Sequence, residues 1–253
     1  MPETIDMGFI IAATLAAFFV GLSKGGLSMV GMLGVPVLAL TMPPLQATAL
    51  LAPIYVASDM VGVYLYRHRF SGRNLAILIP AAGLGIGVGW ATASIADARL
   101  VTLMIGLIGL VFCVDMFLKR KRTLPPRPAD VPRGVIWGAV IGFTSFVSHA
   151  GAPPFQVYVL PQRLEKTVFA GTTTITFAAV NAMKLVPYTA LGQFTLRNLE
   201  FAAMLLPVAL VGTVAGWWLV RVLPERGFYL FVQTTLFLVS LKLVADAFLQ
   251  AAG

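Results

Sequence analysis

Long apolar runs separated by short polar gaps make up most of the chain. The runs lie at residues 8–22, 27–41, 45–66, 74–94, 99–118, 134–147, 153–163, 169–190, 198–219 and 228–250. A helix rises ~1.5 Å per residue, so about 20 apolar residues cross the ~30 Å hydrocarbon core of a bilayer. Most of the runs approach or reach that length, and the pattern therefore predicts an all-α polytopic membrane protein.

Two breaks interrupt this apolar pattern. Residues 8–40 would form one helix of about 50 Å, too long to cross once without extreme tilt. The segment Gly21-Leu22-Ser23-Lys24-Gly25-Gly26 lies in its middle. The second break, Ser148-His149-Ala150-Gly151, is followed by Pro153 and Pro154. We expect each break to join two short helices.

The two halves of the chain resemble each other. Residues recur in order: Phe70 as Phe194 and Arg73-Asn74-Leu75 as Arg197-Asn198-Leu199 at an offset of 124; Pro36 as Pro161 at 125; Pro80, Gly85 and Gly89-Trp90 as Pro207, Gly212 and Gly216-Trp217 at 127. At these offsets the first break falls on the second. We divide the chain into a first transmembrane repeat, 1–118, a basic connector, 119–133, and a second transmembrane repeat, 134–253. Corresponding broken segments in two halves point to a transporter's binding site.

Composition supports the membrane assignment. The chain is 58% hydrophobic and 11% charged, against roughly 25% charged residues in soluble proteins. Its formal net charge is +8, but the basic residues gather in the gaps between apolar runs. Orientation in the membrane explains that placement better than nucleic acid, which we exclude as a partner. The lipid bilayer is the expected partner, and small-residue faces leave a homo-oligomer open.

The positive-inside rule distinguishes two topologies. If each broken segment crosses the membrane once, ten Lys and Arg lie inside and five outside. If each is a hairpin, the second half inverts, and thirteen lie inside against two outside. The hairpin topology fits the rule better. It predicts an inverted repeat, each half a broken helical hairpin plus three transmembrane helices, with a cytoplasmic connector and both termini periplasmic.

Catalytic and metal-binding patterns are absent from the sequence. It contains no HExxH, CxxC, GxSxG or P-loop motif, and its one cysteine, Cys113, allows neither an intramolecular disulfide nor a cysteine metal cluster. We therefore expect no enzyme activity, no metal and no cofactor.

The breaks are the candidate binding segments. A backbone break inside a membrane leaves N–H and C=O groups unpaired, so it persists only where protein or a water-filled cavity satisfies them. The N-terminus of a helix after a break offers N–H groups and about half a positive charge, which suits an anion. The candidate binding residues of the breaks are Ser23, Lys24, Gly25 and Gly26 in the first half, and Ser148, His149 and Gly151 in the second. Packing alone is the alternative explanation of both breaks.

The run at 169–190 adds further polar candidates. Thr172, Thr173 and Thr176 can share one helix face by their spacing, and Asn181 and Lys184 follow on the same helix. Threonines in membrane helices often bond only to their own backbone, whereas amides and charges in apolar helices are costly and usually functional.

Asp59 is the corresponding charged residue within an apolar run of the first half, because at the offset of 124 it falls beside Lys184. The two residues are expected to face each other across the pseudo-two-fold axis. Two roles remain open for this pair: a structural ion pair, or a proton-linked carboxylate that releases Lys184 during transport.

Together these motifs resemble the sulfite exporter TauE/SafE family of bacterial permeases. The resemblance rests on Gly21 to Gly26 with Val35-Pro36, on Gly142-Phe143 through Gly151 with Pro154-Phe155, and on Gly171 to Thr174 with Asn181 and Lys184. It implies a multi-pass bacterial inner-membrane permease for a small sulfur-containing anion such as sulfite, sulfoacetate or a related sulfonate, acting in export. The alternatives are a non-transporting structural or assembly subunit, and an importer of a different small anion.

Overall fold

The computed structural model describes residues 6–42, 44–92, 98–118, 125–190 and 196–252. Within these ranges the regular structure is helical, without strands. The helices are α1 (Met7–Lys24), η1 (Ser28–Leu33), α2 (Gly34–Leu38), α3 (Pro44–Tyr66), α4 (Gly72–Ala91), α5 (Ala98–Leu118), α6 (Val131–Ser148), α7 (Ala152–Val159), η3 (Leu160–Gln162), α8 (Lys166–Ala190), α9 (Leu196–Val222) and α10 (Glu225–Ala252). The all-helical fold predicted from the apolar runs is confirmed.

Five segments in the described ranges are long and apolar enough to cross a membrane: Met7–Lys24, Gly72–Ala91, Val131–Ser148, Asn198–Val222 and Glu225–Phe248. Their outer faces carry large apolar side chains such as Leu84 and Met204, which are 69% and 75% exposed. In water such faces would be costly, so lipid is their natural solvent.

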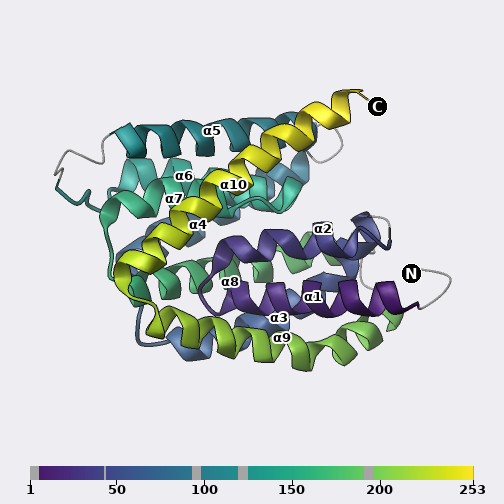
Figure 1. Ribbon diagram of the computed structural model, residues 1–253. Coiled ribbons are helices and arrows are strands. Elements are labelled where there is room, and N and C mark those ends of the chain that lie inside the picture. The colour runs from purple at the N-terminus through teal and green to yellow at the C-terminus, as the bar shows by residue number, and fades with distance from the viewer. Residues whose placement is uncertain (1–5, 43, 93–97, 119–124, 191–195, 253) are drawn as a thin grey trace. The chain divides into compact units, whose positions relative to one another are not determined.

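The helices form two compact units, each drawn from both ends of the chain. The first comprises residues 1–70 and 170–224, and the second comprises residues 71–169 and 225–253. In the first unit α1 packs on α9, with α3 on both (Figure 1). In the second unit α6 packs on α4, and α5 packs on α10. The units group packed helices and do not follow the sequence repeats, whose boundaries stay a prediction.

The first break is a hairpin. α1 ends at Lys24, and the return segment lies back along it, since Gly31 packs on Ser23 and Gly34 packs on Val20. The return segment was expected to be one helix over 27–41, and this is corrected: it is the 3₁₀-helix η1 followed by the five-residue α2. Pro36 lacks an N–H and fits only the first turn of an α-helix, so α2 begins close to it.

The second break is also a hairpin. α6 starts after Asp130, whose carboxylate accepts a hydrogen bond from the N–H of Arg133 and caps the helix. The Tyr158 hydroxyl near the end of α7 donates to the Asp130 carbonyl at 2.9 Å, so α7 runs back along α6. The hairpin form that the charge count favoured is thus confirmed within each unit. The inverted orientation and the sidedness of the termini stay predictions.

Close backbone approach holds both hairpins to their partner helices. A side chain at Gly21 of α1 would overlap the Ala209 carbonyl of α9, and one at Gly142 of α6 would overlap the Ala82 carbonyl of α4. Small residues let membrane helices approach until their backbones touch. The same device therefore fixes the helix before each break in its own unit.

Candidate functional site

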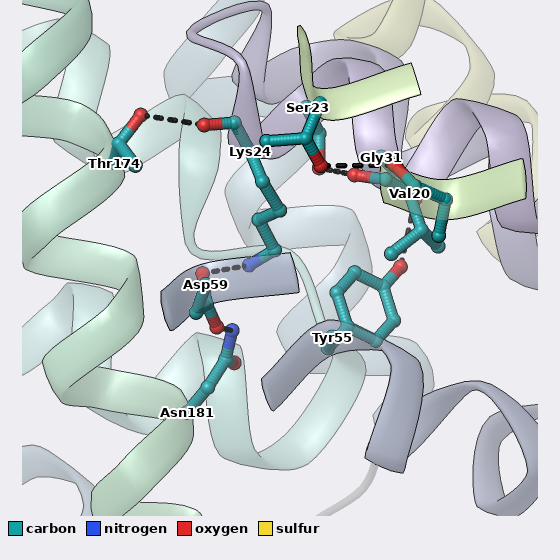
Figure 2. A network of polar contacts seen from close by, with 10 residues as sticks. Val20, Ser23, Lys24, Gly31, Tyr55, Asp59, Thr174 and Asn181 are labelled. Atoms are coloured by element: carbon teal, nitrogen blue, oxygen red, sulfur yellow. Dashed lines mark hydrogen bonds and ion pairs between the residues drawn. The ribbon is translucent and has the colours of Figure 1, made fainter. Parts of the chain in front are cut away.

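A buried ion pair joins the first break to α3. The Lys24 Nζ, at the end of α1, lies 2.8 Å from the Asp59 Oδ1, and both side chains are 6% exposed (Figure 2). The contact is an ion pair rather than a well-aligned hydrogen bond. Asn181 of α8 donates to the other carboxylate oxygen, Oδ2, at 2.7 Å. One carboxylate thus ties together three helices of the first unit.

Lys184 adds a second buried cation to this cluster. Its residue exposure is 5%, and it interacts electrostatically with both Asp59 and Lys24. Lys24, Asp59 and Lys184 are the buried charged residues of the described chain. Two ammonium groups and one carboxylate give this charge cluster a formal net charge of +1.

The ion pair of Asp59 is made with Lys24, whereas the sequence offsets had set Asp59 opposite Lys184. The helix α1 continues through Lys24, two residues past the apolar run, and this brings the ammonium group to α3. Lys24 also lies over the Tyr55 ring, 4.9 Å from its centre, a distance that suits a cation–π contact. The structure brings Lys24, Asp59 and Lys184 close enough to interact, and the register of the hairpin decides which pair is in contact.

Side chains from α3 and α8 satisfy the carbonyl groups of the first break. The Tyr66 hydroxyl donates to the Gly25 carbonyl at 2.7 Å, and Thr174 donates to the Lys24 carbonyl at 3.2 Å. Tyr55 donates to the Gly31 carbonyl at 2.9 Å. A broken backbone in a membrane needs such partners. Tyr55, Tyr66 and Thr174 were not predicted to have these roles. For the two tyrosines a signal was present in the sequence, because a tyrosine in an apolar helix needs an acceptor for its hydroxyl when it is buried.

The glycines of the first break are required by the backbone. Gly26 has a φ of +111°, where side chains are strained. A Cβ there would also lie 2.6 Å from the Tyr66 hydroxyl and 2.8 Å from the Ala170 Cβ. At Gly25 a Cβ would overlap the Thr213 carbonyl of α9. The Ser23 hydroxyl, by contrast, donates to the Val20 carbonyl at 2.6 Å within its own helix.

The expected helix N-terminus at the first break is not formed. Gly25 and Gly26 were expected to precede a helix whose N–H groups face an anion. The chain instead enters a 3₁₀-helix at Ser28, which carries no side-chain cap, and the following α2 is only five residues long. Such short segments have little macrodipole. In the first unit, positive charge therefore comes from lysines and not from a helix end.

The threonines of α8 are fully inside the first unit. Thr172, Thr173 and Thr176 have 0% exposure, and Thr174 has 2%. Thr176 donates to the Thr172 carbonyl one turn earlier, at 2.7 Å. The contact to the break is made by Thr174, the neighbour of the three that the spacing selected. A binding role for Thr172, Thr173 and Thr176 stays a prediction.

The second break, in the second unit, contains no Lys, Arg, Asp or Glu. The Ser148 hydroxyl donates to the Thr144 carbonyl at 3.2 Å. His149 closes α6 in the left-handed region, with φ 53°, and the next N–H, of Ala150, donates to the same carbonyl at 3.3 Å. Glycine usually fills this position, so the backbone of His149 is strained here.

The helix after the second break offers few amide hydrogens. Gly151 precedes α7, and Pro153 and Pro154 in its first turn have no N–H. The N–H of Phe155 already donates to the Gly151 carbonyl. Within this turn, Ala152 is therefore the residue whose N–H has no partner in the helix. A helix begins after the second break as expected, but its first turn has a single unpaired N–H donor, and a binding role for it stays a prediction.

No group of three or more His, Cys, Asp or Glu residues that could hold a metal lies within the described residues. The charge cluster consists of two lysines, one carboxylate and one amide.

Residues 13–243 match the model of the family described as "Sulfite exporter TauE/SafE". The match contains both breaks and every member of the charge cluster. No curated protein and no solved structure matches the chain.

Proposed function

The chain belongs to the TauE/SafE sulfite exporter family of membrane transporters, and on this premise we propose that it is a permease for a small sulfur-containing anion. The proposed substrate is sulfite, sulfoacetate or a related sulfonate. The proposed direction is export across the bacterial inner membrane, with the connector cytoplasmic and both termini periplasmic.

The excess positive charge of the buried cluster carries this proposal. Lys24 and Lys184 face one carboxylate, Asp59, in an interior where charges interact more strongly than in water. A small anion entering this region would balance the second ammonium group. A cation would instead meet net repulsion. The family and the charge of the site thus agree on the sign of the substrate.

Alternating access gives Asp59 a defined part in transport. In the described state the carboxylate binds Lys24 and accepts a hydrogen bond from Asn181. A proton taken up by Asp59 would cancel its charge and release the ammonium group to the substrate. Loss of the proton would restore the ion pair and expel the anion. Asp59 is therefore our candidate for proton coupling.

Thermal unfolding of the purified full-length protein with a panel of anions tests this function. A ligand that binds only the folded state stabilises it by RT ln(1 + [L]/Kd), about 2.7 kcal/mol at one hundred times Kd. We expect stabilisation by sulfite or a sulfonate, and little from acetate or chloride. Proteoliposome uptake and release of the stabilising anion then measure transport and its direction.

Two lysine variants localise the effect. Lys184→Met should lose most of the anion-dependent stabilisation, because it removes the excess charge. Lys242→Met is the matched control, since Lys242 is exposed and pairs with Asp246 on the surface of α10. Stabilisation by no anion between about pH 5 and 8 would contradict the permease and favour a structural subunit. In that case the Lys24–Asp59 pair should also be replaceable by apolar residues with little loss of stability.

A further inference from the structure

Gln156, in the middle of α7, is the most unusual buried polar residue of the second unit. Its side chain lies in the second hairpin with 1% exposure. In the part of the chain that the structure describes, neither its Nε2 nor its Oε1 has a hydrogen-bond partner. Burying an amide with both ends unpaired is costly. Its presence therefore points to a partner that is not a protein group.

The fold satisfies the other glutamine of the same hairpin. Gln162, in η3, donates to the Asn74 Oδ1 at 3.0 Å and accepts from the Asn74 Nδ2 at 2.8 Å. It also donates to the Tyr158 carbonyl at 3.3 Å. Gln162 is a structural residue that links η3 to α4. The contrast shows that the hairpin can pair a buried amide fully, and that at Gln156 it does not.

Helix geometry aims Gln156 at the second break. Side chains in an α-helix lean toward its N-terminus, and Gln156 lies on the same helix face as Ala152, one turn earlier. Ala152 carries the available N–H of the first turn, because Pro153 and Pro154 have none. The positive end of the α7 dipole lies at the same place.

The helix α7 is held rigidly in this position. Phe155 packs edge-to-face on Phe169, with ring centres 6.0 Å apart, and Phe169 packs in the same way on Phe228 and Tyr229. At the far end of α7, Tyr158 is hydrogen-bonded to Asp130. A side chain on a fixed helix can select a ligand by geometry.

We propose that Gln156 and the N–H of Ala152 form a subsite for an oxyanion that carries its own hydrogen-bond donor. The Ala152 N–H and the Gln156 amide hydrogens bind anionic oxygens, and the Gln156 carbonyl accepts the donor of the ligand. An amide has both functions, so a ligand with acceptors alone leaves one end unpaired. The inference rests on the proposed function and narrows its substrate to a sulfonate or sulfite species bearing a hydroxyl or N–H group.

Two sulfonates of nearly equal size test the selectivity. 2-Hydroxyethanesulfonate has a hydroxyl donor, and ethanesulfonate does not. In wild-type protein we expect 2-hydroxyethanesulfonate to bind about tenfold more tightly, measured from the concentration dependence of thermal stabilisation. In Gln156→Met the two sulfonates should bind equally, because the amide that distinguishes them is gone.

The unliganded variants provide a second readout. Without ligand, Gln156→Met should unfold at or above the wild-type temperature, since it removes an unpaired buried amide and no hydrogen bond. Gln162→Met, the matched control, should unfold at a lower temperature but keep the tenfold preference.

Several results would overturn the subsite. One is a fall in unfolding temperature, or loss of folding, in Gln156→Met as large as in Gln162→Met, because the protein would then satisfy the amide. Another is an unchanged preference in Gln156→Met. Stabilisation of the wild type by sulfite but by neither sulfonate would also overturn it, while leaving the permease intact. The proposed function fails only if no anion of the wider panel stabilises the protein.

Discussion

The two breaks close the same kind of hairpin with different chemistry. The first, around Lys24, is charged: a buried ion pair to Asp59 and hydroxyl groups from α3 and α8 hold it. The second, around His149, has no Lys, Arg, Asp or Glu, and its turn is closed by hydrogen bonds to the Thr144 carbonyl of its own helix. Breaks at equivalent places in the two halves therefore indicate where a membrane helix is interrupted, but not which groups satisfy its backbone hydrogen bonds.

The two proposals give different roles to the two breaks. The proposed permease relies on the charge cluster of the first unit to attract an anion. The proposed subsite relies on the unpaired amide of Gln156 in the second unit, which would discriminate between ligands by hydrogen bonding. Variants of one set of residues therefore test one proposal and leave the other set intact.

Removing the Asp59 carboxylate, the partner of Lys24 in the first break, is expected to have the largest effect on stability. Asp59→Leu leaves Lys24 and Lys184 buried with no opposite charge, and should lower the free energy of unfolding by about 3–5 kcal/mol. The double variant Lys24→Met/Asp59→Leu should recover more than half of this loss. Unfolding of the two single variants and the double variant in detergent forms a double-mutant cycle that measures the coupling.

The surface pair Lys242–Asp246 is the control for this cycle. Because both side chains are partly exposed, Lys242→Met should change stability by no more than about 0.5 kcal/mol. A loss below about 1 kcal/mol in Asp59→Leu would contradict a tightly coupled buried cluster.

The next effect concerns the glycine of the same break. Gly26→Ala places a side chain at a positive φ and within 2.6 Å of the Tyr66 hydroxyl, and should cost about 2–4 kcal/mol. Gly87→Ala, on the open face of α4, is the control, since nothing lies within 4 Å of its Cβ. That substitution should be neutral or stabilise by up to about 1 kcal/mol. Equal losses of unfolding free energy in the two variants would contradict a specific backbone strain at Gly26.

The sequence predicted the helices better than it predicted the contacts between them. The helix α6 was expected at 134–147 and lies at Val131–Ser148, because apolar length sets a membrane helix and Asp130 with Pro132 marks its start. The 3₁₀ form of η1 was not foreseen, because it depends on Gly31 packing against Ser23 once the hairpin has closed.

The candidate site shows the same limit. Asp59, Asn181 and Lys184 were selected because polar groups in apolar helices are costly, and the structure brings them together around one carboxylate. The partner of Asp59 was not foreseen, since Lys24 is 35 residues away in sequence and only the hairpin register decides the pairing. Gln156 was visible in its apolar run, but its lack of partners is a property of the fold alone.

The smallest effect is expected at the second break, where the substitution should stabilise the protein instead of destabilising it. His149 has a φ of 53°, a conformation that costs a residue with a side chain about 1–2 kcal/mol and glycine nothing. His149→Gly should therefore stabilise the protein by up to about 1 kcal/mol after the greater freedom of the unfolded glycine is included. We expect it also to weaken anion binding, because strained residues that persist are often retained for function.

Arg163 separates strain from function at that break. It has the same left-handed backbone, with φ 51°, but it is exposed at the end of η3. Arg163→Gly should raise the unfolding temperature as His149→Gly does, yet leave anion-dependent stabilisation unchanged. If both variants gain stability and both keep full anion binding, His149 is only a helix cap, and selection in the second unit rests on Gln156. If His149→Gly alone loses stability, contacts of the imidazole outweigh the strain, and the histidine is held in place by the fold it closes.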